Sequence, residues 1–217
     1  QDNAFGQGNV ASVEAVLGEQ GATVTPILVA EDATEFTPFA QQISAASPDL
    51  VFVAWAGATT GAMWEALAQQ QVLADTTVVT GLADRASYQA YGPGSGDIQF
   101  LNHYFPGATD TEAAQAMDAY LEEQGHEADL FTPDGFVGAQ MLVHAITEGR
   151  GDVAAMIGAL EGWEFESVKG TLTIRAEDHA LIQPMFQVRL VDEDGTWVPE
   201  LIDTADAEAV APAVAAE

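Results

Sequence analysis

Apolar residues recur along this chain in two alternating patterns, one with helical spacing and one in short β-type runs. Over residues 8–20 a spacing of three and four predicts a helix with one apolar face, formed by Val10, Val13, Val16 and Leu17. The β-branched run over 22–29 then predicts a strand. The order repeats further along, with predicted helices over 37–46, 61–71 and 86–91 and predicted strands over 50–55, 76–80 and 98–104.

This alternation of strands and helices predicts an α/β fold with a doubly wound parallel sheet. Buried parallel strands are continuous apolar runs, and Leu50 to Trp55 is such a run. In this architecture ligands bind beyond the carboxyl ends of the strands. The loops over 55–60 and 81–85 follow two of the predicted strands, so the pattern places a candidate binding site there.

After Pro106 the pattern changes to longer amphipathic helices. Helices are predicted over 111–123, 135–148 and 153–160, and the second carries a stripe formed by Phe136, Ala139, Val143 and Ile146. Strands are predicted over 171–175 and 185–192, and Glu193-Asp194-Gly195 predicts a hairpin into residues 196–198. The acidic, Ala-rich segment 201–217 is predicted to be a disordered tail.

Charge is the strongest feature of the composition. The chain has 34 Asp and Glu against 5 Lys and Arg, a formal net charge of −29. Binding to nucleic acid or to anionic lipid needs a cationic surface, so neither is an expected partner. The mutual repulsion of these carboxylates suits a medium that screens charge, and a melting temperature independent of salt would contradict that hypothesis.

Catalytic and metal-binding patterns are not visible in the sequence. The chain has no cysteine, and its four histidines, at 103, 126, 144 and 179, do not have the short spacing of metal ligands. No nucleophile elbow, phosphate-binding loop or paired-carboxylate motif occurs. We therefore expect no enzyme activity, no metal site and no cofactor. No apolar run reaches the roughly 20 residues of a membrane span, and no signal segment opens the chain.

Five segments together resemble the branched-chain amino acid (leucine) binding proteins of ABC importers, which have the type I periplasmic-binding fold. The segments are residues 1–8 (an Asp, then Phe5-Gly6, then a helix), 35–39, 47–51, 131–140 and 170–184. The resemblance implies two lobes. Residues 1–108 with 185–200 would form a ligand-binding lobe, and 109–184 would supply helices and a strand to a second, incomplete lobe whose opening part is not in this chain. The amphipathic helices should therefore expose apolar surface.

The strongest candidate site is the turn after the 50–55 run, with Trp55, Ala56, Gly57 and Thr59. Its backbone N–H groups and hydroxyls, ahead of a helix, suit a carboxylate or amide. The alternatives are that Trp55 only packs at the strand end and that Thr59 or Thr60 only caps the helix. The resemblance adds Phe5 as a ring against the ligand, although an aromatic residue before a glycine turn also serves to hold a helix entry.

The resemblance places further ligand contacts in two later segments. Family members specific for amino acids have an acidic residue where this chain has Ala83, and Asp84 takes that role if the loop shifts by one residue. The alternative is an Asp84 and Arg85 pair in solvent. Phe131 is expected at a pocket wall or in packing between lobes, and Asp134 is expected to cap the helix that follows it. The departure at Ala83 leaves the solute open among amino acids, amides, urea-like compounds and aromatic acids.

The resemblance implies a monomeric extracytoplasmic protein that captures a small polar solute by hinged closure of two lobes and delivers it to ABC importer permease subunits. A single lobe should bind the solute weakly or not at all. A ligand-sensing receptor module of the same fold is the alternative function, and an enzyme on a doubly wound α/β fold is less favoured.

Overall fold

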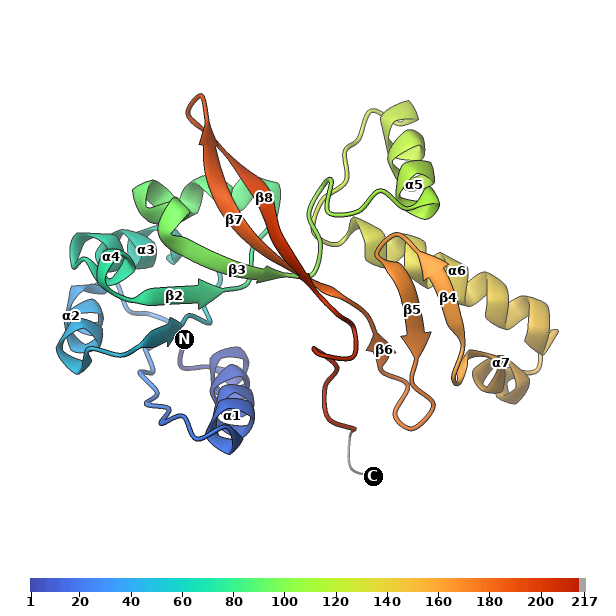
Figure 1. Ribbon diagram of the computed structural model, residues 1–217, viewed down its shortest axis with the longest axis horizontal. Coiled ribbons are helices and arrows are strands. Elements are labelled where there is room, and N and C mark those ends of the chain that lie inside the picture. Colours follow the sequence, from blue (N-terminus) through green and yellow to red (C-terminus); the bar gives the residue numbers. More distant parts are fainter. Residues whose placement is uncertain (215–217) are drawn as a thin grey trace. The chain divides into compact units, whose positions relative to one another are not determined.

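A computed structural model describes residues 1–214 (Figure 1). Contacts between residues divide the chain into two compact units. Unit 1 comprises Gln1–Gly81, Ala86–Phe100 and Arg189–Glu200, and unit 2 comprises Leu82–Arg85, Leu101–Val188 and the chain from Leu201 onward. The chain therefore passes from unit 1 to unit 2 after Phe100, within the strand Ile98–Asn102. It returns to unit 1 after Val188, within the strand Met185–Glu193. The lobe boundaries expected from the sequence lie near these crossings and stay a prediction.

Unit 1 contains most of the alternating elements that the sequence predicts. Its helices are α1 (Ala4–Glu19), α2 (Thr37–Ala46), α3 (Thr60–Gln69), the short α4 (Val72–Asp75) and most of the 3-10 segment η1 (Arg85–Asp97). Its strands are β1 (Leu50–Phe52), β2 (Thr77–Thr80) and most of β3 (Ile98–Asn102). Parts of β7 (Met185–Glu193) and β8 (Thr196–Ala205) complete the unit.

The main sheet has five strands in the order β1-β2-β3-β7-β8. The first three pair in parallel, with Val51 opposite Val78 and Val78 opposite Ile98. Val78 and Ile98 are completely buried, but burial alternates along each strand, and Leu50, Phe52 and Gln99 are exposed. The α/β fold class is confirmed, with a sheet that is parallel over β1, β2 and β3. The predicted hairpin is also confirmed: Asp194 and Gly195, both with positive φ, join β7 to β8.

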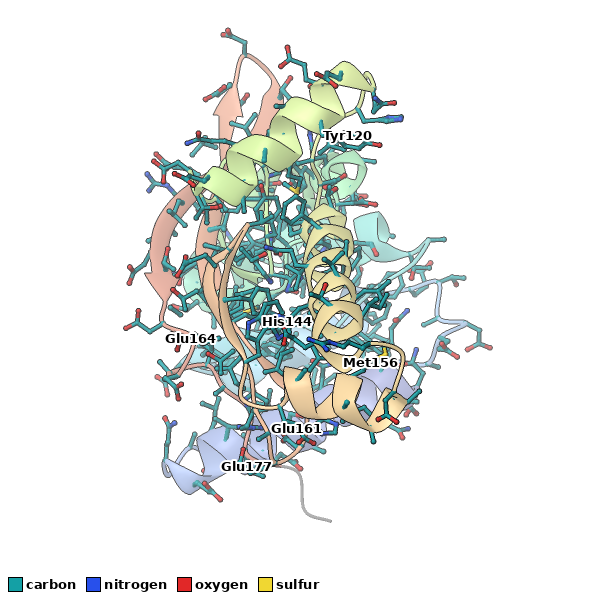
Figure 2. All side chains as sticks on the ribbon, turned by 90° about the vertical axis from the view of Figure 1, so that its right-hand side faces the viewer. Tyr120, His144, Met156, Glu161, Glu164 and Glu177 are labelled. Atoms are coloured by element: carbon teal, nitrogen blue, oxygen red, sulfur yellow. The ribbon has the colours of Figure 1, made fainter. Side chains whose placement is uncertain are left out.

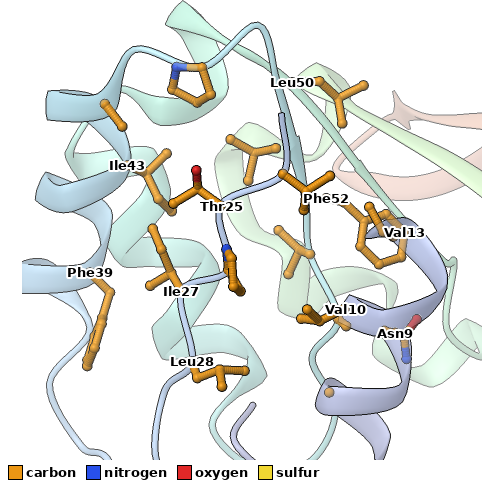
Figure 3. A pocket seen from close by; sticks show the side chains of 18 of the residues that line it. Asn9, Val10, Val13, Thr25, Ile27, Leu28, Phe39, Ile43, Leu50 and Phe52 are labelled. Atoms are coloured by element: carbon orange, nitrogen blue, oxygen red, sulfur yellow. The ribbon is translucent and has the colours of Figure 1, made fainter. Parts of the chain in front are cut away.

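The strand predicted over 22–29 is wrong. The segment forms no ladder with β1, and its end is held by a backbone hydrogen bond from Asp2 N–H to the Val29 carbonyl, 2.7 Å. A cavity of about 670 Å³ lies among this segment, β1, α1 and α2 (Figure 3). Leu28, Leu50 and Phe52 are each about 40% exposed beside it. The β-branched run is apolar enough for a strand but lacks the adjacent backbone that would complete one.

Unit 2 contains α5 (Glu112–Glu123), α6 (Thr132–Gly149) and α7 (Val153–Leu160) with a small antiparallel sheet. The sheet order is β4-β5-β6, for strands Glu164–Ser167, Gly170–Ile174 and Leu181–Ile182. Side chains of Val137, Phe165, Leu172 and Ile174 form its core, so the inner face of α6 packs on the sheet. Next to this core the rings of His144, Trp163 and Phe165 stack in series with centroids 3.9 and 4.0 Å apart.

The opposite face of α6 is not covered in this chain. Leu142, Val143 and Ile146 are each more than half exposed, and Val153 and Ile157 continue the apolar surface on α7. Figure 2 faces this part of the chain and labels His144, from α6, and Met156, from α7. The exposed apolar surface expected from the amphipathic stripe is therefore confirmed for α6.

The prediction of a disordered tail is wrong at its start. Residues 201–205 continue β8, because a hairpin that begins with a two-residue turn extends as far as both strands can pair. Beyond the strand, the Arg175 guanidinium donates to the Pro212 carbonyl at 2.7 Å and to the Ala213 carbonyl at 3.4 Å. The final part of the predicted tail, residues 215–217, lies outside the described residues.

Two glycines of α6 give a matched test of its packing against α7. A Cβ on Gly149 would lie 2.7 Å from the backbone nitrogen of Met156, whereas one on Gly138 meets nothing within 4 Å. We expect Gly149→Ala to lower the free energy of unfolding by about 1–3 kcal/mol and Gly138→Ala to raise it by up to about 1 kcal/mol. Urea denaturation of both variants measures this, and equal effects at the two sites would refute the close helix approach.

Candidate functional site

Strands β1 and β2 end at the same edge of the sheet. The Val53 N–H donates to the Val79 carbonyl at 2.9 Å, and the Thr80 hydroxyl donates to the Val53 carbonyl at 2.8 Å. Parallel pairing with this register carries the chain out of both strands on one side. The predicted turn at residues 55–59 begins at this edge, and the chain beyond Gly81 passes from it into unit 2.

The turn after β1 is built around Trp55. The indole Nε1–H donates to the Thr59 hydroxyl at 3.2 Å, and the ring packs edge-on against Phe36 with centroids 5.3 Å apart. Gly57 has φ of +97°, a conformation open mainly to glycine. The Thr60 hydroxyl donates to the Gly57 carbonyl at 2.7 Å. These bonds fix the turn while Trp55 keeps part of its surface in solvent.

The alternatives for this turn can now be separated. Thr59 stands at the N-cap position of α3 but makes no side-chain capping bond, so the cap interpretation is wrong. Trp55 does pack at the strand end, against Phe36. Ala56 and Gly57 are exposed, and the Ala56 N–H reaches the Gln1 side chain at 3.3 Å. Phe5, in the first turn of α1, is 53% exposed, so much of its ring is accessible.

The remaining predicted contacts lie in unit 2. Ala83 is half-buried and Asp84 is exposed. The neighbouring Arg85 forms an ion pair with Glu127, and its backbone N–H donates to the Asp129 carboxylate at 3.1 Å. Phe131 precedes α6 and is 70% exposed. The predicted residues therefore fall into two groups, one in each unit, and each group is partly or fully accessible within its own unit.

The predicted capping role of Asp134 is wrong. The helix start has no side-chain cap, and the Asp134 carboxylate instead contacts Nε2 of His103 at 2.5 Å. The Lys169 ammonium lies 3.1 Å from Nδ1 and 3.2 Å from Nε2 of the same ring. Lys169 is only 3% exposed. Burial lowers the pKa of Lys169 to about 8, and the Asp134 charge acts in the opposite direction.

Sequence reasoning did not find this cluster. His103 and Lys169 are 66 residues apart, and Lys169 stands in the short turn between β4 and β5, where a lysine is ordinarily solvated. Neither residue belongs to a motif with recognisable spacing. Only the fold brings the three side chains together, so no local signal was present to find them.

The cavity in unit 1 is not a site suited to a polar solute. Its walls are mainly aliphatic and aromatic side chains from α1, α2, β1 and the 22–29 segment, and Asp49 is the one charged residue among them in the part of the chain described (Figure 3). A polar solute needs several converging donors and acceptors, which this lining does not supply. No group of three or more His, Cys, Asp or Glu able to hold a metal occurs within residues 1–214.

The sequence profile of the periplasmic binding protein family matches residues 1–196. The chain belongs to this family. Its fold is that of solved family structures, including an ABC-type branched-chain amino acid transporter protein from Rhodopseudomonas palustris. That protein is 24% identical with a TM-score of 0.87, over 99% of this chain and 60% of the other.

Two further structures show the same fold. One is a leucine-, isoleucine-, valine-, threonine- and alanine-binding protein from Brucella ovis in a closed conformation, 20% identical with a TM-score of 0.83, over 99% of this chain and 58% of the other. The second is an ABC transporter solute-binding protein from R. palustris in complex with 4-hydroxybenzoate, 18% identical with a TM-score of 0.79, over 95% and 58%.

The comparisons also show how much of a family member this chain covers. It spans about 60% of the length of the family structures that it matches. No curated protein sequence matches it. Among the helices of residues 1–214, none combines the length and the apolar character needed to cross a lipid bilayer.

Lys169 gives a pH-dependent test of the cluster. Because the pKa is lowered from 10.5 to about 8, the folded chain releases this proton at a lower pH than the unfolded chain. Below about pH 8 both states are protonated and the folded state bears the full cost of the buried charge. Between pH 8 and 10.5 the unfolded state binds more protons, so stability rises with pH, by up to about 3 kcal/mol.

We expect Lys169→Met to be more stable than the parent chain at pH 7.5, because a buried ammonium is replaced by an apolar chain of similar length. The difference should shrink as the pH rises towards 10.5. Urea unfolding of both proteins at several pH values isolates this group, since the other titrating residues are common to both. A difference that is independent of pH would show that folding does not lower the pKa of Lys169.

Proposed function

We propose that this chain is the larger part of a solute-binding component of an ABC importer, which captures a small polar solute outside the cytoplasm. The observation that carries the proposal is the turn built by Trp55 and Thr59 at the carboxyl edge of the parallel strands, in a chain of the periplasmic binding protein family. Ligands of doubly wound folds bind at that edge.

In this proposal the solute is held by two sets of residues. Unit 1 would contribute Phe5, Trp55, Ala56, Gly57 and Thr59, and unit 2 would contribute Ala83, Asp84 and Phe131. The accessible surface of Phe5 and Phe131 supports roles for both rings. Ligand that contacts both sets favours the closed form, because only that form makes all the contacts at once. Transport requires no chemical step, and the protein is non-catalytic.

The ligands of related structures support a proposal for the class of solute. Among structures with this fold, the one from Brucella ovis is an amino-acid-binding protein, and two from R. palustris are in complex with 4-hydroxybenzoate and with benzoate. All of these ligands are small molecules with a carboxylate. We therefore propose a small carboxylate-bearing or amide-bearing solute, with the permease subunits of an ABC importer as the protein partner.

The uncovered face of α6 and α7 supports the assignment of residues 109–184 to an incomplete lobe. Leu142, Val143 and Ile146 expose an apolar stripe of a kind that soluble domains normally bury. The family structures are longer than this chain by roughly two fifths of their own length. We propose that a part of the longer protein covers this face.

Replacing Trp55 tests the solute site. In a thermal-shift screen of the full-length protein, which supplies both lobes, against amino acids, amides and aromatic acids, we expect at least one solute to raise the melting temperature. Trp55→Ala should then weaken its binding at least tenfold in calorimetry, because a site aromatic contributes about 1.5 kcal/mol or more. Trp197→Ala, on the β7–β8 hairpin, should leave affinity within twofold. Equal losses in the two variants would contradict a site at the turn.

The exposed helix face has its own test. The triple change Leu142→Gln, Val143→Gln and Ile146→Gln should reduce binding of a hydrophobic dye such as ANS to the 217-residue chain. Each change should alter the free energy of unfolding by no more than about 0.5 kcal/mol, because these side chains are already exposed. A loss of several kcal/mol would mean that the face is part of this chain's own core.

A further inference from the structure

The segment that follows β8 is held on unit 2 by one arginine. Arg175 comes directly after β5, and its guanidinium donates to the Pro212 carbonyl at 2.7 Å and to the Ala213 carbonyl at 3.4 Å. The two acceptor residues are exposed and lie in a segment, residues 206–214, that forms neither helix nor strand. The contact joins parts of the chain that are 37 residues apart.

The guanidinium is fixed by its own loop. Its Nε donates to one carboxylate oxygen of Asp178 at 2.8 Å, and its Nη2 donates to the other at 2.7 Å. The side chains of Arg175 and Asp178 are only 16% and 9% exposed. The Arg175 N–H donates to the Ala180 carbonyl and the His179 N–H donates to the Arg175 carbonyl, each at 2.9 Å, which closes the loop. A guanidinium held by both prongs loses little freedom when it binds a further acceptor.

The distribution of charge favours the same contact. The sequence has five Lys and Arg against 34 Asp and Glu, so a cation near the acidic end of the chain is a scarce group. The pKa of Arg175 is raised, first by the hydrogen bond to Asp178, against the opposing effect of burial, and also by the charges of Asp178, Glu177 and Glu208. Glu208 belongs to the segment after β8. That segment therefore interacts with Arg175 through two backbone carbonyls and through one side-chain charge.

The contact closes a loop that includes strands of both sheets. Between Arg175 and Pro212 the chain forms β6 of the small sheet and then β7 and β8 of the main sheet. The chain has no cysteine, so a disulfide cannot close this loop. Side-chain donors to the backbone are the means that the sequence has for holding its two ends together.

The end of β8 is the part of this loop that most needs support. β8 is an edge strand, and within residues 1–214 its one neighbouring strand is β7. Its last five residues, Leu201–Ala205, belong to unit 2, and Leu201 and Ile202 are each more than 40% exposed. Strand ends with few buried contacts open locally at low cost. After the strand the chain turns, with the Asp206 carbonyl accepting from the N–H groups of Ala209 and Val210, and then reaches Arg175.

We propose that residues 206–213 form a strap, held by Arg175, that anchors the end of β8 to the small sheet of unit 2. Without the strap, Leu201–Ala205 would depend on pairing with β7. Because β8 begins in unit 1 and enters unit 2 after Glu200, the strap also restrains one of the segments that join the two units. The inference goes beyond the proposed function and requires no solute.

Backbone dynamics test the role of Arg175 in the 217-residue chain. In ¹⁵N relaxation measurements, the order parameters of the Ala209, Val210 and Ala213 amides should be near the ~0.85 of rigid backbone, and Arg175→Gln should lower them below ~0.6. Arg85→Gln makes the same charge change at another arginine of unit 2 that pairs with a carboxylate, so it should leave them unchanged. Values in Arg175→Gln equal to those of the parent, or an equal loss in both variants, would overturn the proposal.

Two shortened chains test whether the strap anchors β8, and they decide the matter even if Arg175→Gln fails to fold. A chain that ends at Val214 keeps both acceptor carbonyls, whereas a chain that ends at Ala205 has no strap. In hydrogen exchange, the amides of Leu201–Ala205 should exchange about tenfold faster in the shorter chain, the change expected when a hydrogen bond to a charged group no longer opposes local opening. The longer chain should match the parent. Equal exchange in the two shortened chains would show that β8 does not depend on the segment, and would overturn the proposal.

Discussion

The parallel pairing of β1, β2 and β3 is the constraint on which the rest of unit 1 depends. Each strand is only three to five residues long, so the sheet is held by few backbone hydrogen bonds and by side chains that exclude water completely, such as Val78 and Ile98. Because the strands run the same way, their ends emerge together. The turn at Trp55 and the chain leaving β2 at Gly81 therefore start from the same edge, although 26 residues separate them in sequence.

Much of this arrangement could be predicted from the sequence, since it is encoded locally. Leu50 to Phe52 and Thr77 to Thr80 are apolar or β-branched runs, and α2 and α7 were predicted with the bounds that the structure has. The wrong and missed strand predictions arise because local sequence does not show which strands find a neighbour. The 22–29 run has the composition of a strand, but a strand exists only when a neighbour supplies hydrogen bonds. The small strands β4 and β6 were missed because Glu164–Ser167 and Leu181–Ile182 are too short to show a period.

The candidate site likewise contains residues that could be predicted from the sequence and residues whose roles could not. The turn from Trp55 to Thr59 could be placed because it directly follows a recognisable strand, and the resemblance to a family supplied Phe5 and Phe131. The role of Thr59 was missed although its partner lies only four residues away, and the role of Asp134 could not be predicted because only the fold brings its partner close. The Thr59 hydroxyl accepts from the Trp55 indole, and Asp134 bonds to a histidine 31 residues away. A capping preference is a local tendency, and a stronger acceptor role in tertiary structure overrides it.

The open edge of β1 has a consequence for how the protein behaves in solution. β1 ends the main sheet, so one side of its backbone has no neighbouring strand within residues 1–214, and Leu50 and Phe52 are partly exposed beside it. Such an edge is a template on which a second molecule can add a strand. The net charge of −29 keeps molecules apart at low ionic strength. Added salt thus acts in two places: it screens the repulsion between carboxylates inside each molecule, and it screens the repulsion between molecules.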